Sequence, residues 1–578
     1  MTLVEALRFF IDEAARFVSP LAVAIQWELV LLAALVIWLA PATFGKKLRP
    51  LRAAFGRLAN HRAASIAFCG ILPVAIRLAL LGIYPVPEPS IHDEFSHLLL
   101  ADTLVHGRLT NPPHPLWQHF ESIHIIQQPT YNSMYPPGQG AFLALGIWLF
   151  HEPWAGVLIS VGLMFAAMSW MMQAWLPPKW ALFGTLVAML AFGLTTLWMN
   201  SYMGGAVSSI GGALVLGAVR RLRRPGGKVG QSILLGVGIV LLMNTRPFEG
   251  LVLTAVATCY LAVGLWPTWR KIAWAHIAIP LGFIVSAGLL FTGYYNWRVT
   301  GSPVRMPYEV NRDTYGWPEN LGFLPMKNVT LRHRDMRDMY RKEIAHHEIY
   351  SSWDRFVDSL DVRAFENWSF FGGPALTIPL LLLPQVFLDR RTRPLVVILA
   401  VMLGLNVFQM VLYAYHLGPI IPALFAVIAQ GSRHVYVLLS RTKPARGIAF
   451  VLLLPLCVAA ASTLKLEAAD LGIPLTYWEH GVESHQQARA YISSWLSRRP
   501  RKQLVIVHYA PNHSPDQEWI YNAADLDASK VVWAREMDPK SDAELIDYFK
   551  DREVWLLNAD SYPQRVVRYN ADSALCEP

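Results

Sequence analysis

The sequence predicts a polytopic α-helical membrane protein that carries a small α/β domain at its C-terminal end. Hydrophobic residues make up 54% of the 578 positions and charged residues only 16%, whereas soluble proteins carry about a quarter. About twelve apolar segments approach the roughly 20 residues that a helix needs to cross the hydrocarbon core. Four cysteines in so long a chain exclude a disulfide framework. The composition also excludes collagen, a coiled coil, a disordered chain and a plain cytosolic enzyme.

About twelve membrane spans are expected from these apolar segments. They lie near residues 20–41, 64–84, 155–175, 180–198, 203–219, 230–245, 250–266, 272–296, 370–388, 394–414, 418–438 and 446–463. The apolar run 138–150 is too short for a span, so we expect a helix lying on the outer membrane surface. Residues 1–19 contain Glu5, Asp12 and Glu13 and lack the basic start of a signal peptide, which favours an amphipathic interfacial helix.

Basic residues concentrate in one set of loops, which the positive-inside rule places in the cytoplasm. These residues are Lys46, Lys47, Arg49, Arg52, Arg57, Arg62, Arg220, Arg221, Arg223, Arg224, Lys228, Arg270, Lys271, Arg390, Arg391, Arg393, Arg441, Lys443 and Arg446. The membrane domain, residues 20–463, then has two large outer loops, 85–154 and 297–369, and residues 464–578 form an extracytoplasmic domain. Because the net charge of +9 is spread over many loops and forms no single stripe, we expect no nucleic-acid partner.

The C-terminal domain has the pattern of a small α/β fold. Apolar runs at 504–509, 531–535 and 554–557 predict short buried strands. Ser541 and Glu544 form a capping-box pattern that predicts the start of a helix. The sequence contains no G-x-G-x-x-G or G-K-[ST] loop, so this domain carries no signature of nucleotide binding.

The first outer loop holds the densest group of polar residues. Asp93 and Glu94 are neighbours at the mouth of a span, and Asp93 shares a face with His97 on a helix that begins near Ser90. Two carboxyl groups with histidines nearby suit general-base catalysis or divalent metal binding. The alternative is that Ser90 and Asp93 only cap a juxtamembrane helix.

Other outer-loop residues are candidates for the same site. His92, Glu121 and His124 could hold a divalent metal, together with His97, although their spacing is not diagnostic of a metal site. Three tyrosines of the outer loops are further candidates. They are Tyr131, Tyr135 and Tyr202.

These features resemble those of the GT-C glycosyltransferases. The Asp93–Glu94 pair follows an early span, amphipathic outer-surface helices come next, and the segment from Tyr413 to Pro422 reads YAYHLGPIIP. With the order of the spans, they are most similar to the family 39-like branch of protein O-mannosyltransferases and aminoarabinose transferases. The resemblance extends from about residue 64 to about residue 465.

The resemblance implies an inverting glycosyltransferase at the outer face of a bacterial-type inner or plasma membrane. Its donor would be a polyprenyl-phosphate-linked sugar, and its acceptor a hydroxyl group of a protein, a lipid or a glycan. In the family, the residue matching Asp93 deprotonates that hydroxyl, and we expect burial beside Glu94 to raise the pKa of Asp93. The missing nucleotide-binding loop agrees with this, because a nucleotide sugar would be confined to the cytosol.

The next outer loop departs from the family pattern. Residues 200–205 read NSYMGG and contain no carboxylate, whereas related enzymes often carry a second acid there. Either Glu249 takes that role, or the metal and the acceptor are held differently. A divalent metal therefore stays open as a cofactor.

Residues 244–250 break two spans at the outer face and place Arg246 and Glu249 close to hydrocarbon. A charge there costs about 2.5–3.5 kcal/mol on insertion scales, so the presence of these two charged residues requires a structural or functional explanation. Either they pair with each other, or the planar guanidinium of Arg246 binds the lipid phosphate. His416 could also meet this phosphate, or it is a satisfied interfacial histidine. Aromatic and polar residues at 301–308 suit stacking against a sugar.

Two other classes of function compete with glycosyl transfer. A transporter or flippase would place ionisable residues near the membrane midplane and often shows repeated halves. Here the charges gather at one face and no repeat is evident. A non-catalytic envelope-assembly protein would leave the dense histidine and carboxylate cluster of the first loop unexplained.

Overall fold

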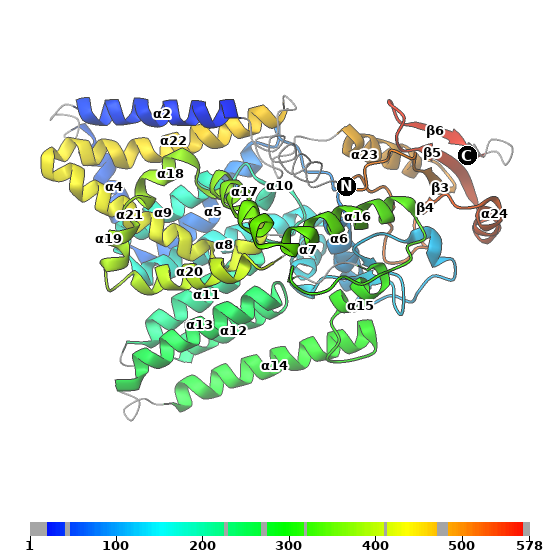
Figure 1. The fold of residues 1–578 in the computed structure, drawn as a ribbon, viewed down its shortest axis with the longest axis horizontal. Coiled ribbons are helices and arrows are strands. Elements are labelled where there is room, and N and C mark those ends of the chain that lie inside the picture. The colour runs from blue at the N-terminus through cyan, green and yellow to red at the C-terminus, as the bar shows by residue number, and fades with distance from the viewer. Residues whose placement is uncertain are drawn as a thin grey trace.

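The computed structural model describes residues 20–40, 47–224, 229–267, 274–316, 321–409, 413–470 and 484–569. In this part of the chain, a bundle of apolar helices fills one side of the molecule and a β-sheet lies at the opposite end (Figure 1). The amphipathic helix expected over residues 1–19 lies outside the described residues, as do the basic residues Lys46, Lys228, Arg270 and Lys271.

The bundle is built from helices that coincide with the predicted spans. They are α2 (Pro20–Leu39), α5 (Arg62–Ala79), α8 (Pro153–Trp175), α9 (Pro178–Ala188), the π-helical turn η2 (Met189–Gly193), α11 (Ala206–Leu222), α12 (Val229–Met243), α13 (Pro247–Leu265), α14 (Ala275–Thr300), α18 (Gly373–Leu380), α19 (Leu383–Leu388), α20 (Arg393–Asn406), α21 (Ile421–Thr442) and α22 (Pro444–Asp470). One predicted span, 370–388, is divided between α18 and α19. Pro379 and Pro384 lie at this break, where proline removes a backbone donor and disfavours helix in the preceding residue.

Six helical segments of the described residues are long and apolar enough to cross a membrane. They are Arg62–Ala79, Pro153–Trp175, Pro247–Leu265, Ala275–Thr300, Ala414–Thr442 and Pro444–Leu464. Five shorter apolar helices accompany them. By length and composition this is an integral membrane protein, whereas the total of about twelve spans stays a prediction.

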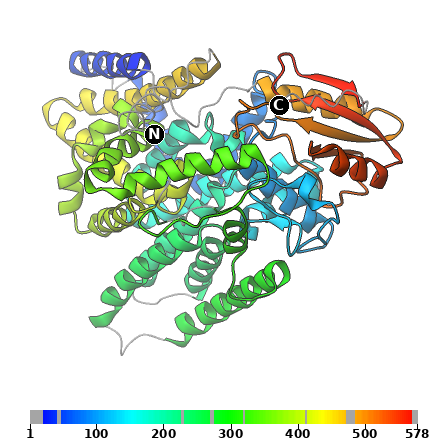
Figure 2. The same ribbon diagram turned by 45° about the vertical axis from the view of Figure 1, so that its right-hand side comes forward.

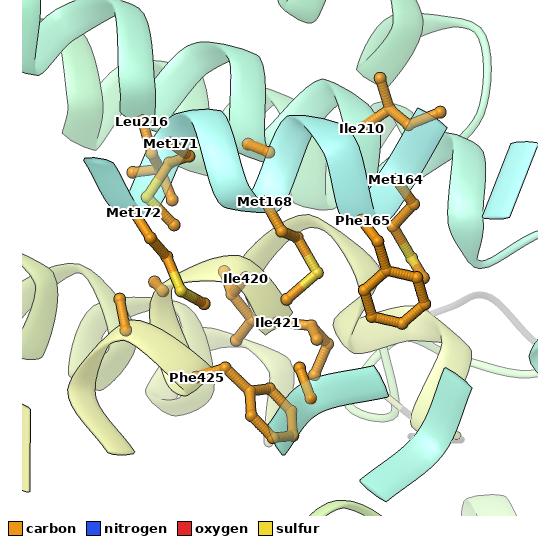
Figure 3. Close-up of a cluster of buried hydrophobic side chains, with 14 of the residues drawn as sticks. Met164, Phe165, Met168, Met171, Met172, Ile210, Leu216, Ile420, Ile421 and Phe425 are labelled. Atoms are coloured by element: carbon orange, nitrogen blue, oxygen red, sulfur yellow. The ribbon is translucent and has the colours of Figure 1, made fainter. Parts of the chain in front are cut away.

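The centre of the bundle is packed around α8. Met168 and Met172 of this helix point toward Ile421 and Phe425 of α21, and Met164 lies beside Phe165 (Figure 3). Unbranched methionine side chains fill the irregular space between crossing helices.

A glycine fixes how closely the turn before α21 approaches the bundle centre. This turn is the 3-10 helix η5 (Ala414–Ile420), which packs against α11. A Cβ atom at Gly212 of α11 would lie 1.9 Å from the carbonyl oxygen of Pro419, so no larger residue fits. The contact holds the aromatic residues of η5 at one end of the bundle.

The remaining helices and two short strands lie mostly at that same end. They are α4 (Arg49–Asn60), α6 (His92–Val105), η1 (Trp117–Phe120), β1 (Ile125–Ile126), β2 (Asn132–Ser133), α7 (Pro137–Phe150), α10 (Leu197–Asn200), α15 (Pro307–Tyr315), α16 (Arg334–Glu348), η4 (Ile349–Ser351) and α17 (Trp353–Phe371). Of these, α4 lies at the opposite end of the bundle (Figure 1). There Arg391 lies within electrostatic range of Arg220, Arg224 and Arg433. The basic loops and the large loops therefore occupy opposite ends, as the alternation of spans predicts.

The helix α7 coincides with the run 138–150, and it packs tightly on the start of α8. A Cβ atom at Gly156 would lie 2.0 Å from the carbonyl oxygen of Phe142, so the two helices touch backbone to backbone. Its location on the membrane surface stays a prediction.

The C-terminal residues form a four-stranded sheet with the order β4-β3-β5-β6. The strands are β3 (Lys502–His508), β4 (Val531–Arg535), β5 (Arg552–Asn558) and β6 (Arg565–Arg568), and the helices are α23 (Ser484–Ser497) and α24 (Pro539–Tyr548). The first three strands are parallel, as buried apolar runs favour, and β6 pairs antiparallel with β5. The three predicted strands are confirmed, and β6 was not predicted.

The predicted start of the C-terminal helix was wrong by three residues. α24 begins at Pro539, and the side chain of Asp538 accepts hydrogen bonds from the backbone N–H groups of Lys540 and Ser541. Asp538 therefore caps this helix, and Ser541 lies inside its first turn.

Candidate functional site

Glu94 fixes the start of α6, the helix that carries the acidic pair. One carboxylate oxygen accepts hydrogen bonds from the backbone N–H groups of Ser90 (2.9 Å) and Ile91 (3.4 Å), and the other accepts from Tyr202 N–H (3.0 Å). Only 4% of Glu94 is exposed. The alternative that Ser90 and Asp93 only cap this helix is wrong, because Glu94 supplies the cap. The side chain of Asp93 therefore contacts residues other than the backbone N–H groups at the start of α6.

Asp93 meets two residues that flank the short β1–β2 hairpin, His124 before it and Tyr135 after it. The hydroxyl of Tyr135 donates a hydrogen bond to Asp93 Oδ1. His124 Nδ1 lies 3.4 Å from Asp93 Oδ2 and 3.2 Å from the Tyr135 oxygen. The antiparallel pairing of Ile125 with Ser133 brings the two ends of this segment together. Asp93, His124 and Tyr135 thus form one compact polar cluster.

The pKa of Asp93 moves in the direction opposite to the one expected. Burial acts to raise it, but the proximity of His124 and the hydrogen bond from Tyr135 outweigh burial and hold it well below its usual range. Burial does raise the pKa of the neighbouring Glu94. The prediction assigned the effect of burial to the wrong member of the pair, because the histidine and tyrosine contacts come from other segments.

His97 lies one turn after Asp93 on α6, and the predicted shared face is confirmed. Its ring stacks on Tyr135 with the ring centroids 4.5 Å apart. Burial lowers the pKa of His97 to about 3, so the imidazole is neutral at physiological pH. Its Nδ1 atom is buried without a hydrogen-bond partner among the described residues.

Arg246 lies at the start of α13, with its guanidinium 4.8 Å from the ring centroid of Tyr415. Within the described ranges, its side chain makes no hydrogen bond and no ion pair within 4.0 Å. Glu249 instead accepts a hydrogen bond from Gln409 Nε2 (3.1 Å). Of the two alternatives for this pair, mutual pairing is therefore wrong. Burial acts to lower the pKa of Arg246, but Tyr308 and Glu249 raise it, so the group stays charged.

Aromatic rings connect Asp93 to Arg246. The ring of Tyr135 meets the edge of Tyr308 at 5.5 Å, and Tyr308 also interacts electrostatically with Arg246. Tyr308 lies in the aromatic stretch 301–308, where the sequence singled out no individual residue. We refer below to Asp93, His97, His124, Tyr135, Tyr308 and Arg246 as the Asp93–Arg246 site.

His416 lies beside this site through its neighbour in η5. Its ring meets that of Tyr415 edge-on at 4.6 Å, and Tyr415 lies under Arg246. A role for His416 in binding a phosphate stays a prediction.

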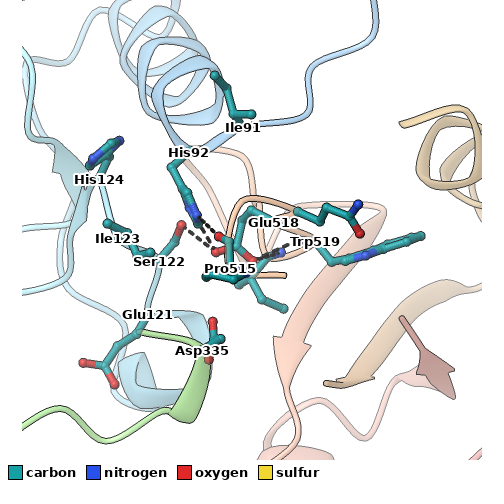
Figure 4. Close-up of polar contacts among 12 residues, drawn as sticks. Ile91, His92, Glu121, Ser122, Ile123, His124, Asp335, Pro515, Glu518 and Trp519 are labelled. Carbon is teal, nitrogen blue, oxygen red and sulfur yellow. Dashed lines mark hydrogen bonds and ion pairs between the residues drawn. The ribbon is translucent and has the colours of Figure 1, made fainter. Parts of the chain in front are cut away.

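The three expected metal ligands do not form a metal site, although the rings of His92 and His124 meet edge-on with their centroids 5.8 Å apart. His92 Nε2 contacts the Pro515 carbonyl oxygen (2.7 Å), and its Nδ1 lies 3.4 Å from Glu518 (Figure 4). Glu121 pairs with Arg332 (2.8 Å) and His333 (3.0 Å). His124 pairs with Asp93 instead. In the described part of the chain, no group of three metal-ligating side chains is placed to hold an ion, so these residues do not fit the expected divalent metal.

Two of the candidate tyrosines hold the loop in place. The Tyr131 hydroxyl donates to the carbonyl oxygen of Asn522 (3.0 Å), and the Tyr202 hydroxyl donates to that of Pro87 (3.0 Å). Both side chains are buried, with 2% and 4% exposed. Of the three tyrosines, only Tyr135 lies in the Asp93–Arg246 site.

A buried ion network joins the first outer loop to the C-terminal sheet, and the sequence did not predict it. Arg535 at the end of β4 pairs with Asp335 of α16 (2.6 Å) and with Glu518 (3.1 Å). Glu518 also accepts a hydrogen bond from Ser122 (3.0 Å) and lies beside His92 (Figure 4). The sheet therefore lies directly against the loop that carries Asp93 (Figure 2).

Comparison with known proteins gives remote structural likenesses. No family model matches the sequence, and no curated protein matches it. ArnT from Cupriavidus metallidurans bound to undecaprenyl phosphate is similar over 84% of this chain and 92% of its own, with 12% identity and a TM-score of 0.46. The oligosaccharyltransferase AglB from Archaeoglobus fulgidus, in complex with an inhibitory peptide and a dolichol-phosphate, is similar over 87% and 70%, with 11% identity and a TM-score of 0.40.

Both neighbours are GT-C glycosyltransferases, the superfamily that the sequence resembles. Because the likenesses are remote, they carry no weight for the chemistry of this chain, which depends on its own residues.

Proposed function

We propose that this protein is an inverting glycosyltransferase that moves a sugar from a polyprenyl-phosphate donor to an acceptor hydroxyl at the outer face of the membrane. The observation that carries the proposal is the Asp93–Arg246 site. It combines a carboxylate held in its ionised form with a charged guanidinium that makes no hydrogen bond or ion pair within 4.0 Å among the described residues. Tyrosine rings connect the two groups at one end of an apolar bundle.

Arg246 is suited to bind the phosphate of a lipid-linked donor. A guanidinium offers a planar pair of N–H donors that match phosphate oxygens. Arg246 lies where α12 ends and α13 begins, next to helices with the length and composition of membrane spans. A lipid carrier presents its phosphate at this depth. Negative charge grows on the phosphate as the bond to the sugar breaks, and a fixed cation stabilises that charge.

Asp93 is suited to take the proton of the acceptor. The acceptor oxygen attacks C1 of the sugar from the face opposite the phosphate, the C1–O bond to phosphate breaks, and its electron pair stays on the phosphate oxygen. The hydroxyl proton passes to Asp93. A carboxylate of low pKa can accept it, because the hydroxyl becomes acidic only as its oxygen bonds to C1. This single displacement inverts the anomeric carbon.

The neighbours of Asp93 orient it for this step. The Tyr135 hydrogen bond and His124 fix both carboxylate oxygens, and preorganised polar groups need no rearrangement during the reaction. Glu94, whose oxygens are occupied by backbone N–H groups, acts as a positioning residue for α6. We assign no step to a metal, and none to Glu249, which is engaged with Gln409.

The distribution of charge supports the outer-face location. The basic loops lie at the end of the bundle opposite the Asp93–Arg246 site, and the positive-inside rule places them in the cytoplasm. The site and the C-terminal sheet would then face the outside of a bacterial-type inner or plasma membrane. A donor anchored in the lipid is available there. The acceptor is a hydroxyl-bearing protein, lipid or glycan.

Release of free lipid phosphate tests the proposal. Purified protein would be incubated with a panel of undecaprenyl-phosphate sugars and a membrane extract as the acceptor source. We expect the wild type to release undecaprenyl phosphate and Arg246→Ala to release it about 10²–10³ times more slowly. Arg341→Ala, which removes an exposed guanidinium on α16, is the matched control.

Three outcomes of this experiment separate the candidate functions. Release that depends on Arg246 supports glycosyl transfer. Binding of the donor without release would favour a flippase or transporter. Neither binding nor release would point to a non-catalytic assembly protein.

A further inference from the structure

Glu343 is a buried acid for which the reaction above has no use. It lies on α16 with 7% of its surface exposed. In the described part of the chain, its carboxyl group makes no hydrogen bond and no ion pair within 4.0 Å. The adjacent Lys342 does not neutralise it, because Lys342 pairs with Asp516 (2.7 Å). An unpartnered carboxyl in such a place is unusual, since buried polar groups almost always have a partner.

The geometry of α16 places Glu343 next to the Asp93–Arg246 site. Met336, two turns earlier on the same helical face, packs in one cluster with Ile123, the residue before His124. In the middle of the helix, Lys342 contacts Asp516, in the segment that also touches His92. The buried face of α16 therefore runs across the loop that holds His92 and His124.

The electrostatics agree with this placement. Burial raises the pKa of Glu343 to about 8, with Asp516 and Asp93 adding to the rise and Lys342 opposing it. Glu343 is thus a neutral acid near pH 7 within electrostatic range of the ionised Asp93. Two carboxyl groups whose surroundings drive their pKa values apart are typical of an active site that uses both forms.

A purely structural role does not explain Glu343. A buried acid without a partner lowers the stability of the fold, and an apolar side chain of similar size would serve packing better. Asp335 on the same helix shows the contrast, because it is buried against Arg535. Residues that lower the stability of the fold are typical of sites where function depends on them.

We propose that Glu343 contacts the acceptor, its carboxyl group hydrogen-bonding a hydroxyl or other polar oxygen next to the one that Asp93 deprotonates. This inference rests on the proposed function. Lys342, the neighbour of Glu343, contacts Asp516 of the C-terminal residues, whereas Arg246, the proposed phosphate ligand, begins the membrane helix α13. The acceptor thus enters between α16 and α6, and a neutral acid can both donate and accept a hydrogen bond there.

Substitution of Glu343 separates this role from a structural one. Glu343→Met removes the polar group at similar size, Glu343→Gln keeps a donor and an acceptor, and Glu348→Gln, on an exposed acid of the same helix, is the control. We expect Glu343→Met to have an unchanged or higher Tm. Its kcat/KM for the acceptor extract should fall about tenfold, the effect of one lost hydrogen bond, with the KM for the donor unchanged. Glu343→Gln should recover part of that loss.

A second measurement does not depend on transfer. Dicyclohexylcarbodiimide modifies protonated carboxyl groups in apolar surroundings, and the modified residue is found by mass spectrometry. We expect an adduct on Glu343 near pH 7 and none on Asp93, with less labelling when a membrane extract that supports transfer is added.

Each outcome of these measurements decides something. A lower Tm in Glu343→Met with a proportional loss of transfer would show that Glu343 has a structural role, and this would overturn the proposal. A change confined to the KM for the donor would also overturn it. If the wild type releases no lipid phosphate with any donor, the proposed function fails and acceptor contact fails with it. Labelling would still show whether Glu343 is an acid open to a ligand.

Discussion

At the scale of single residues, Asp93 shows how contacts from distant segments reverse the effect of burial. The carboxyl group is largely buried, which alone would raise its pKa, yet the proximity of His124 and the hydrogen bond from Tyr135 lower it. The sequence identified Asp93, His97 and Tyr135 as candidates because polar residues cluster in one loop. It could not show that Glu94, and not Asp93, would meet backbone donors.

His124 should therefore control the acidic limit of activity. In His124→Gln the group that most lowers the pKa of Asp93 is lost, and burial then raises this pKa relative to the wild type. Because transfer needs ionised Asp93, activity should be lost at a higher pH than in the wild type. The acidic limb of kcat/KM against pH measures the shift. His106→Gln, with a half-exposed side chain at the end of α6, should leave the limb in place. An unmoved limb in His124→Gln would contradict the role of this contact.

At the scale of elements, α6 is held at both ends by residues that lie far away in the sequence. Glu94 accepts a hydrogen bond from Tyr202 N–H at its start, and Asp102 accepts one from Ala524 N–H (2.7 Å) near its end. Helical periodicity predicted that Asp93 and His97 share a face. The partners come from the loop after α10 and from the segment between β3 and β4, and the spacing of residues within α6 indicates neither of them.

Glu94→Gln should loosen the first turn of α6. The amide presents a donor to backbone N–H groups, so at least one of the contacts with Ser90, Ile91 or Tyr202 is lost. We expect the free energy of unfolding to fall by about 1–3 kcal/mol. Hydrogen exchange at the start of α6 should become faster, and transfer slower. Exchange rates equal to those of the Glu348→Gln control would contradict the positioning role.

At the scale of the whole molecule, composition predicted the division into an apolar bundle and polar outer parts, and the charged loops predicted which loops lie together. The strands at 504–509, 531–535 and 554–557 were also predictable, since buried strands appear as short apolar runs. The docking of the sheet against the first outer loop was not predictable from the sequence. It depends on Arg535, whose partner Asp335 lies 200 positions earlier in the chain, and no local pattern indicates such a pair.

Arg535 should be essential for attaching the C-terminal sheet. Arg535→Met would leave Glu518 and Asp335, which are 2% and 8% exposed, without their cation. Breaking a buried pair in this way costs about 3–5 kcal/mol. We expect a lower Tm and faster proteolysis near residue 484, measured against Arg501→Met, which changes an exposed arginine beside the same sheet. Equal Tm values for the two variants would show that other contacts hold the sheet.

The transfer activity of Asp93→Asn is the direct test of whether Asp93 takes the proton of the acceptor hydroxyl. The amide keeps the size of the side chain but cannot accept the acceptor proton. The measurement is the rate at which undecaprenyl phosphate is released from the donor that the wild type uses, with Asp338→Asn, on a partly exposed and paired acid of α16, as the control. We expect Asp93→Asn to release undecaprenyl phosphate about 10²–10⁴ times more slowly than the wild type, and the control to release it at the wild-type rate. Release at the wild-type rate by folded Asp93→Asn would contradict this role of Asp93.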